Sequence, residues 1–341
     1  MRRRTLLALV AMLAAGTAVA QQPRIQTTLV GNDLVVRLGP VMLMAHADHA
    51  SVDQLTLQTF QTPVGGWLRG YRAEVVDEAG RPLPQELLHH AELVDLERRD
   101  LLRSALNRVV SVGKETAPIM LPPGMGYPIR RGQTLGINSM VHNPTDTDYH
   151  VAYVRVTLTV TPDSVTPPLR NVLGFYAETS PTGSSTGDNT VNATSSFDLP
   201  PGPSQQVVTF TVPVAGQVLG VGGHIHDFGE GIVLVRAATG DTLYNAVPRK
   251  DSTGEVLGMP LRPMFGRTVH IAAGERFVMT VRYNNTSGRM LAGAGMGTLA
   301  VVFVPDDMAA WPALDPNAPG ILADLAGLRS KHQAMMEMHM H

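Results

Sequence analysis

The segment Val151-Ala152-Tyr153-Val154-Arg155-Val156-Thr157-Leu158-Thr159-Val160 is the most regular part of the chain. Side chains of a strand alternate between its two faces, so Val154, Val156, Leu158 and Val160 share one face, and the segment predicts a strand. Similar short runs occur at 27–30, 33–38, 41–45, 54–60, 206–212, 218–226, 232–236, 267–271, 277–283 and 298–304. Short strands at such intervals, with few helices, predict all-β sandwiches.

Two segments have helical spacing. Leu102, Leu106 and Val109 lie on one face of a helix drawn through 97–109, which we interpret as either a helix or a long connection. The spacing of apolar residues from Ile321 to Leu328 predicts a helix over about 321–336. The proline-rich stretch 161–168 reads as an interdomain connection. We therefore expect domains at 21–163 and 164–308, followed by a helical, Met/His-rich tail at 309–341.

The N-terminus has the features of a secretory signal peptide. Met1-Arg2-Arg3-Arg4-Thr5 is basic, 6–15 is apolar, and Ala18-Val19-Ala20 is an Ala-x-Ala cleavage site, so we expect a signal peptide over 1–20 and a mature protein from Gln21. Arg3-Arg4 leaves open a twin-arginine signal or a plain secretory signal. No later segment reaches the roughly 18 apolar residues of a membrane span. These features predict a periplasmic or secreted protein.

Composition narrows the partners. The chain has no cysteine, a formal net charge of −2 and 17 methionines. Without disulfides, the fold depends on its cores and on any bound metal. A net charge so close to zero argues against nucleic acid or an acidic membrane surface as the main partner.

A His-x-His pair is the first candidate for a metal site. In Gly222-Gly223-His224-Ile225-His226-Asp227-Phe228-Gly229, two histidines in a predicted strand project their imidazoles to the same face. The flanking glycines let other groups approach closely. Such a pair either holds two corners of a metal site or consists of ordinary surface or core residues.

Other soft or borderline ligands occur at His89-His90, at His142, and at Met290 and Met296. Imidazole suits copper and zinc, whereas thioether sulfur selects cuprous copper, so the combination indicates copper. Adjacent histidines on a regular strand face opposite ways. His89 and His90 can therefore share one ion only at a bulge or a strand end; otherwise one is a core residue and the other is solvated.

The order of these features resembles the type II copper, ascorbate-dependent monooxygenases, the family of peptidylglycine α-hydroxylating monooxygenase and dopamine β-monooxygenase. The landmarks are, in chain order, His89-His90, Leu121-Pro122-Pro123-Gly124-Met125-Gly126, Ser139-Met140-Val141-His142-Asn143-Pro144, Pro167-Pro168-Leu169 through Gly174-Phe175-Tyr176, His224-Ile225-His226 and Gly295-Met296-Gly297. They extend over most of the mature chain. Each motif is weak alone, and their shared order carries the resemblance.

The resemblance implies two jelly-roll-like β-sandwich domains, each with one copper ion, that face each other across a solvent cleft. In this family ascorbate reduces both ions; the methionine-ligated ion binds oxygen and removes hydrogen from a substrate C–H bond, and the other ion supplies the second electron. The ligands implied here are His89, His90 and His142 for the electron-transfer copper, and His224, His226 and Met296 for the oxygen-binding copper.

Three features depart from the family. The arginine that binds a substrate carboxylate, two residues before the His-x-His, corresponds to Gly222, and the asparagine and tyrosine after the methionine correspond to Thr298 and Ala300. The family's disulfides are absent. A peptide ending in glycine is therefore not the expected substrate, and the substrate stays open.

Several other residues have two interpretations. Met296 is preferred to Met290 because it directly precedes the final predicted strand. His46 and His49, with Met42 and Met44, form either a third site or a polar turn. His150 is interpreted as a surface residue, and His270 as a core or ligand-orienting residue. Asp227 either orients a ligand or is solvated. The terminal cluster Met335-Met336-Glu337-Met338-His339-Met340-His341 either captures copper or is a frayed helix end.

The sequence thus predicts an exported copper-dependent monooxygenase that hydroxylates a C–H bond of a small substrate with O2 and with ascorbate or another electron donor. A copper-delivery protein is a further candidate partner. The alternative is a non-catalytic periplasmic copper-binding protein for storage, sensing or delivery. A third interpretation is a β-sandwich scaffold whose histidines serve packing or the surface.

Overall fold

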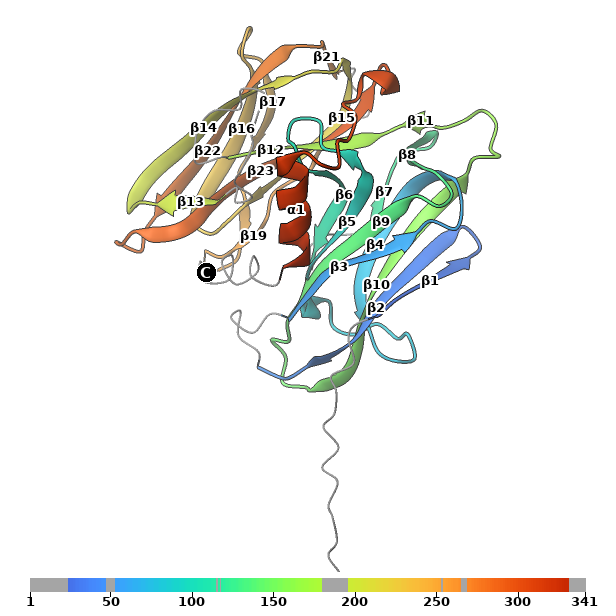
Figure 1. Ribbon diagram of the computed structural model, residues 1–341. Helices are drawn as coiled ribbons and strands as arrows, with labels where there is room; N and C mark the ends of the chain where they lie inside the picture. Colours follow the sequence, from blue (N-terminus) through green and yellow to red (C-terminus); the bar gives the residue numbers. More distant parts are fainter. Residues whose placement is uncertain are drawn as a thin grey trace, which may run out of the picture.

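The structure of the protein is a computed structural model that describes residues 24–46, 53–114, 116, 118–179, 196–252, 254–264 and 269–330. It consists of two consecutive jelly-roll-like antiparallel β-sandwiches and a short C-terminal helix, as the sequence predicts (Figure 1). Among the described residues, no helix has the length and apolar character needed to cross a membrane.

The first sandwich pairs a seven-stranded sheet with a four-stranded sheet. The larger sheet runs β1 (Arg24–Val30), β2 (Asp33–Leu43), β10 (Tyr149–Pro162), β4 (Gly66–Val76), β8 (Met125–Ile129) and β11 (Arg170–Asn171), with β7 (Ile119–Met120) also paired to β4. The smaller sheet runs β3 (Asp53–Gln61), β9 (Thr134–Val141), β5 (Leu88–Arg99) and β6 (Leu106–Gly113). The 3-10 turn η2 (Gln85–Leu87) leads into β5.

The second sandwich pairs a six-stranded sheet with a four-stranded sheet. The larger sheet runs β12 (Leu173–Glu178), β23 (Leu291–Pro305), β15 (Gly216–Ile225) and β20 (Arg262–Pro263), with β13 (Ser196–Leu199) on β23 and β21 (Val269–Ile271) on β15. The smaller sheet runs β14 (Gly202–Val212), β22 (Glu275–Asn285), β16 (Gly229–Arg236) and β17 (Thr242–Ala246). A separate hairpin joins β18 (Arg249–Lys250) and β19 (Val256–Gly258).

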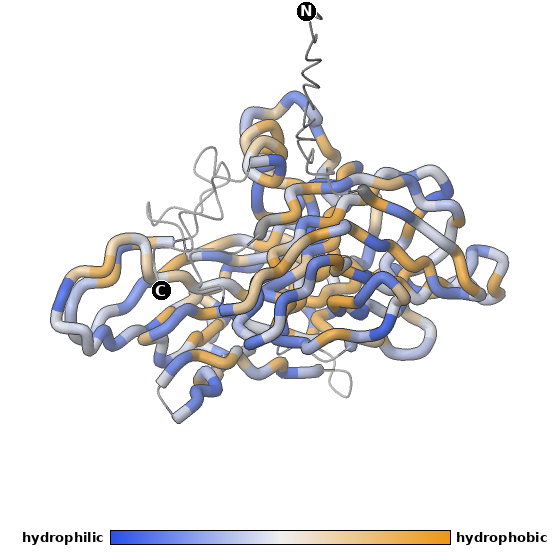
Figure 2. Tube along the Cα trace, turned by 90° about the horizontal axis from the view of Figure 1, so that it is seen from below, coloured by the Kyte–Doolittle hydropathy of each residue, from blue (hydrophilic) through white to orange (hydrophobic). Residues whose placement is uncertain are grey.

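Alternation of apolar residues builds the cores. In β10, Val154, Val156 and Leu158 have no exposed surface and Val160 has 3 %, so the predicted buried face is confirmed. Each such side chain contributes about 1.5–3 kcal/mol of transfer free energy. Figure 2 shows the corresponding alternation of hydrophobic and hydrophilic residues along the strands.

The C-terminal helix α1 (Pro319–Arg329) follows the second sandwich in sequence but packs on the first. Its Ile321 and Leu328 are buried in a cluster with Leu57, Val94 and Leu106 from the four-stranded sheet. The short η3 (Met308–Ala310) leads toward it, and the Trp311 indole N–H donates to the Arg99 carbonyl at 3.0 Å. The helix thus covers apolar surface that the first sandwich alone would leave exposed.

A bidentate ion pair holds this helix on the first sandwich. The Arg108 guanidinium donates to both carboxylate oxygens of Asp324 at 2.6 and 2.8 Å, and the Leu106 N–H donates to the same carboxylate at 2.9 Å. Burial would raise the pKa of Asp324, but the charge and hydrogen bonds of Arg108 outweigh burial and hold that pKa below its ordinary value.

The two sandwiches contact each other through β6 and β12. The Asn107 amide donates to the Gly174 carbonyl at 2.8 Å, and Arg103 pairs with Glu178 at 2.6 Å. The Tyr176 N–H donates to the fully buried Asp100 carboxylate at 3.2 Å. Directed polar contacts of this kind fix one relative orientation of the two sheets.

Residues 97–109 form neither a helix nor a long connection. Strand β5 continues to Arg99 and β6 begins at Leu106. The Asp100 carboxylate accepts the N–H groups of Leu102 and Arg103 at 2.9 and 3.0 Å, and this turns the chain sharply between the strands. The helix predicted from the spacing of Leu102 and Leu106 is therefore wrong.

The helix near the C-terminus is shorter than predicted and starts earlier. Proline at its first turn begins it at Pro319, and it ends at Arg329 rather than near 336. The Met/His-rich end, 331–341, lies outside the described residues. The domain boundary at 163/164 stays a prediction; β10 ends at Pro162, and β11 pairs in parallel with β8 before β12 enters the second sandwich.

Candidate metal centre

His89 and His90 lie at a β-bulge. In the ladder between β5 and β9, Leu88 pairs with Val141 and His90 pairs with Met140, so His89 is the extra residue. The two rings approach edge to face, with their Nδ1 atoms 3.3 Å apart. The irregular backbone that a shared ion would require is thus present.

His142 approaches this pair from the neighbouring strand. It directly follows β9, and its N–H donates to the Leu87 carbonyl at 3.1 Å. Its side chain is buried, and its ring centroid lies 5.7 Å from that of His89. Three imidazoles from two strands therefore gather at one end of the four-stranded sheet.

The spacing of the His89 and His90 nitrogens suits a metal. Two nitrogens that each lie about 2.0–2.1 Å from one ion in a tetrahedral arrangement are about 3.3 Å apart. In the described part of the chain, no three His, Cys, Asp or Glu side chains form a group that could hold an ion as they stand.

His224 and His226 lie at the end of β15, next to β23. His224 pairs with Thr298 and Ile225 with Gly297, so the next step in register places His226 opposite Met296. Opposite residues in an antiparallel pair project to the same face. The two rings are 5.2 Å apart and nearly perpendicular; His224 is exposed, and His226 and Met296 are half-buried. The register thus puts a thioether on the face that carries both imidazoles.

Tyr283, from β22, ties the two ligand-bearing strands together. Its hydroxyl accepts the N–H of Met296 at 2.8 Å and that of His226 at 3.3 Å, and it donates to the Met296 carbonyl. Burial raises the pKa of Tyr283 to about 12, so the hydroxyl keeps its proton at neutral pH. One buried hydroxyl therefore sets the relative position of the His226 and Met296 backbones.

The His226 ring has a partner that suits a ligand. Its Nδ1 lies 3.3 Å from the Ala294 carbonyl, which can only accept, so this contact favours the tautomer with the proton on Nδ1. Histidine ligands commonly donate their second nitrogen to a backbone carbonyl in this way. The residue types and their surroundings fit copper at this position.

We expect Tyr283→Phe to lower the free energy of unfolding by about 1–3 kcal/mol, because two partly buried N–H groups lose their acceptor. We also expect copper affinity at the His224–His226 position to fall about tenfold, since the ligand backbones lose their tie. Urea unfolding and a copper-competition titration measure the two effects. Tyr127→Phe is the matched control: its hydroxyl donates to the Asp95 carboxylate in the first sandwich at 2.6 Å, so copper affinity at the His224–His226 position should hold. Equal copper loss in both variants would contradict the role of Tyr283.

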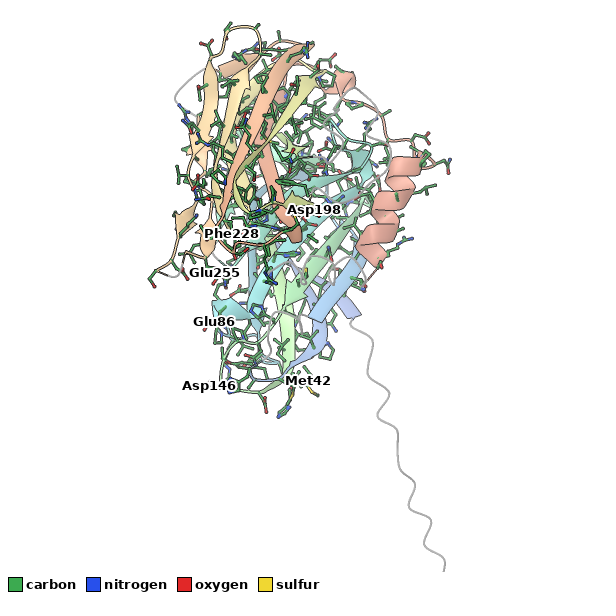
Figure 3. All side chains as sticks on the ribbon, turned by 90° about the vertical axis from the view of Figure 1, so that its left-hand side faces the viewer. Met42, Glu86, Asp146, Asp198, Phe228 and Glu255 are labelled. Atoms are coloured by element: carbon green, nitrogen blue, oxygen red, sulfur yellow. The ribbon has the colours of Figure 1, made fainter. Side chains whose placement is uncertain are left out.

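The other candidate ligands lie elsewhere. Met290 is 58 % exposed and precedes β23. His46 pairs with Asp146 at 3.5 Å on the exposed end of the first sandwich, where Met42 also lies (Figure 3). Met44 is exposed too, whereas His49 falls outside the described residues. Whether His46 and His49 form a third site stays open.

The structure also shows the surroundings of His270, Asp227 and His150. His270 lies on the surface and pairs with Asp306 at 2.7 Å. It is opposite Gln217, at the end of β15 that is remote from His224. His270 is therefore neither a core residue nor a ligand-orienting residue. The Asp227 carboxylate accepts the Val256 N–H at 2.8 Å and so holds β19 against β15. His150 is exposed, as predicted.

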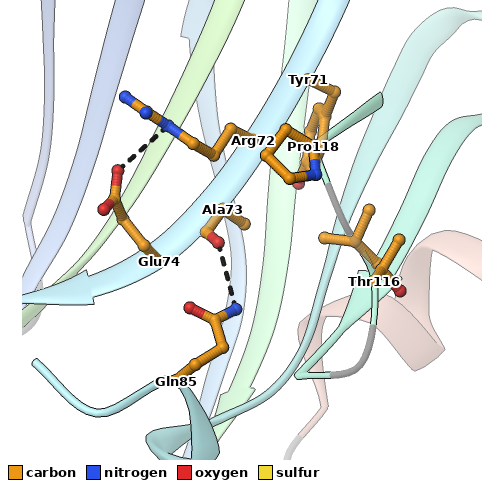
Figure 4. Close-up of a pocket in the computed structure, with 8 residues that line it drawn as sticks. Tyr71, Arg72, Ala73, Glu74, Gln85, Thr116 and Pro118 are labelled. Atoms are coloured by element: carbon orange, nitrogen blue, oxygen red, sulfur yellow. Dashed lines mark hydrogen bonds and ion pairs between the residues drawn. The ribbon is translucent and has the colours of Figure 1, made fainter. Parts of the chain in front are cut away.

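The first sandwich contains a pocket. It is lined by residues of β4, η2, β6 and the segment before β7, namely Tyr71, Arg72, Ala73, Glu74, Gln85, Val112, Thr116 and Pro118 (Figure 4). The Tyr71 hydroxyl donates to the Ala91 carbonyl at 3.4 Å, one residue from His90. Sequence reasoning found neither this pocket nor Tyr283, because both depend on pairing between distant strands.

No known protein family matches the sequence, and no curated protein does. Among solved structures, the chain is similar to the Sulfolobus Turreted Icosahedral Virus structure, with TM-score 0.36, 9 % identity, and 94 % of this chain and 98 % of that chain covered. It is also similar to the major capsid protein P2 of bacteriophage PM2, with TM-score 0.32, 10 % identity, and 80 % and 98 % covered. Similarity at this level carries no information about function.

Proposed function

We propose that this protein is an exported copper-dependent monooxygenase that hydroxylates a C–H bond of a small substrate with O2 and a reductant such as ascorbate. The observation that supports it is the difference between the two ligand sets. One set contains imidazoles alone, at a bulge in the first sandwich, and the other adds the Met296 thioether opposite His226. The resemblance to the type II copper monooxygenases rests on the same residues.

Each set has chemistry suited to its role. Copper would supply one-electron redox chemistry and oxygen activation. An all-imidazole set serves a centre that passes through both oxidation states, whereas a thioether favours the cuprous state. His89, His90 and His142 would hold the first ion, and His224, His226 and Met296 the second. The Ala294 carbonyl favours the proton on His226 Nδ1, and Tyr283 holds the ligand backbones in register.

Copper counting combined with oxygen uptake tests this function. The mature protein is loaded with copper, the tightly bound ions are counted, and oxygen consumption is followed with ascorbate and a panel of C–H substrates. Two ions with ascorbate-dependent turnover are expected. His270→Ala is a matched histidine control and should retain both ions and turnover, since His270 pairs with Asp306 at the end of β15 remote from His224.

The other outcomes separate the alternatives. Two ions without turnover on any substrate would favour a copper protein for storage, sensing or delivery. No tightly bound copper would contradict both functions and favour a scaffold. The count of ions therefore decides between metalloprotein and scaffold before any substrate is known.

A further inference from the structure

One face of the second sandwich continues from the His224–His226 position into a surface made of small and apolar residues. The pairings of β12 with β23 and of β23 with β15 place Glu178, Thr298 and His224 in one row across that face. The next row contains Tyr176, Ala300 and Gly222. We call Tyr176, Gly222, Leu261, Thr298 and Ala300 the Gly222 surface.

Leu261 ends the second row. Val221 pairs with Arg262 and Gly220 with Pro263, so the next step in register places Leu261 opposite Gly222. A Cβ added to Gly222 would lie 3.6 Å from Leu261 Cδ1, which confirms that the leucine lies beside the glycine. Leu261 is 63 % exposed, and the Tyr244 hydroxyl holds the preceding Pro260 carbonyl at 2.7 Å. An exposed leucine is thus held in place beside Gly222, two residues before His224.

Thr298 supplies a polar group that needs a partner. Its side chain is only 9 % exposed, and its Oγ1 is buried without a hydrogen-bond partner among the described residues. A buried hydroxyl without a partner costs about 1–3 kcal/mol. Because Thr298 lies opposite His224, that hydroxyl is on the face that carries the proposed second copper. A ligand bound there would satisfy it.

The charges on this face do not favour an anion. Among the described residues of β12, β15, β20 and β23, the charged side chain on this face is Glu178, which Arg103 neutralises at 2.6 Å. Arg262 pairs with Val221, so it projects to the opposite face, and it donates to the Leu243 carbonyl at 3.1 Å. The first sandwich brings two cations near Tyr176, Arg103 and Arg108, and they already pair with Glu178 and Asp324 at 2.6 Å. A carboxylate at the Gly222 surface would have to compete with those partners, so its desolvation would be poorly compensated.

We propose that the Gly222 surface binds an uncharged substrate. Its apolar part contacts Leu261 and Ala300, and its carbonyl or hydroxyl oxygen accepts a hydrogen bond from Thr298. This inference rests on the proposed function, because the substrate is bound beside the proposed ligand His224. It assigns the substrate class: neutral molecules with an apolar group, in preference to carboxylates.

A pair of probes with the same shape tests this. We use 4-phenylbutanamide and 4-phenylbutanoate, with affinities measured by calorimetry on the full chain before and after copper loading. The amide should bind at least tenfold more tightly than the carboxylate. Thr298→Val should weaken amide binding about five- to tenfold. Leu261→Asp should weaken it further, and Val207→Asp, on exposed surface of the opposite sheet, should leave it unchanged.

Gly222→Arg is the complementary test. Gly222 does not have a positive φ, and a Cβ added there would meet only Leu261 Cδ1 at 3.6 Å, so arginine fits. The variant should bind the carboxylate probe more tightly than the amide probe. Equal affinity for the two probes, or no binding of either, would overturn the inference. If the chain binds no copper but shows these probe effects, the proposed function fails and the binding surface stands. If copper and turnover are intact but the probes bind alike, the surface alone fails.

Discussion

A chain carrying His226→Ala is expected to retain one copper ion where the unaltered chain retains two. The substitution removes the imidazole that the β15–β23 register places opposite Met296, and the first histidine cluster lies in the other sandwich. Loss of a residue that merely orients a ligand costs about 10–100-fold in metal affinity, so loss of the ligand itself should cost at least about 100-fold. Ascorbate-dependent oxygen uptake should fall to background. Competition titrations with cuprous and cupric chelators measure both sites.

Met296→Ala separates the two oxidation states. Because thioether sulfur prefers cuprous copper, this variant should lose cuprous affinity at the second site and keep most of its cupric affinity there. His270→Ala serves as the histidine control, since His270 pairs with Asp306 at the far end of β15. If Met296→Ala or His226→Ala weakened both copper sites equally, the assignment of ligands to two separate sites would be wrong.

Arg108→Ala should lower the free energy of unfolding by about 3 kcal/mol at neutral pH. The Asp324 side chain, on α1, is only 15 % exposed. The substitution removes the guanidinium that donates to both of its carboxylate oxygens. Urea unfolding at several pH values measures the effect. Arg130→Ala removes an exposed pair with Glu97 and should cost no more than about 1 kcal/mol.

The pH dependence of this cost has a definite sign. The folded pKa of Asp324 lies below its unfolded value of about 3.9, so the ion pair contributes fully above about pH 5. Its contribution is lost as the pH falls through the lowered pKa. The stability difference between Arg108→Ala and the unaltered chain should therefore narrow below about pH 4. A difference that stays constant down to pH 3 would mean that Arg108 acts through packing alone.

Local patterns predicted the parts of the fold that depend on alternation. The run at 151–160 lies within β10, and its even-numbered residues from Val154 to Val160 are buried. The pattern failed at 97–109, where the Asp100 carboxylate makes a turn and also accepts the N–H of Tyr176 from the second sandwich. A contact between residues 76 positions apart cannot be read from spacing within one segment.

Local patterns also predicted one part of the candidate site and missed the rest. Alternation alone implies that His89 and His90 need a bulge to share an ion, and a bulge is present. The proximity of Met296 to His226, the tie through Tyr283 and the position of Leu261 depend on how β15 pairs with β23 and β20 and packs on β22. Register between strands that are distant in sequence is set by the whole packed sandwich, so composition and spacing could not predict it.

The packing of α1 on the first sandwich has a consequence for biosynthesis. A ribosome releases β10 about 160 residues before it releases Ile321 and Leu328, which cover Leu57, Val94 and Leu106. The nascent first sandwich therefore carries an open apolar patch while the second is still being made. A fragment truncated near residue 163 would keep that patch permanently and would tend to self-associate. Only the complete chain can cover it.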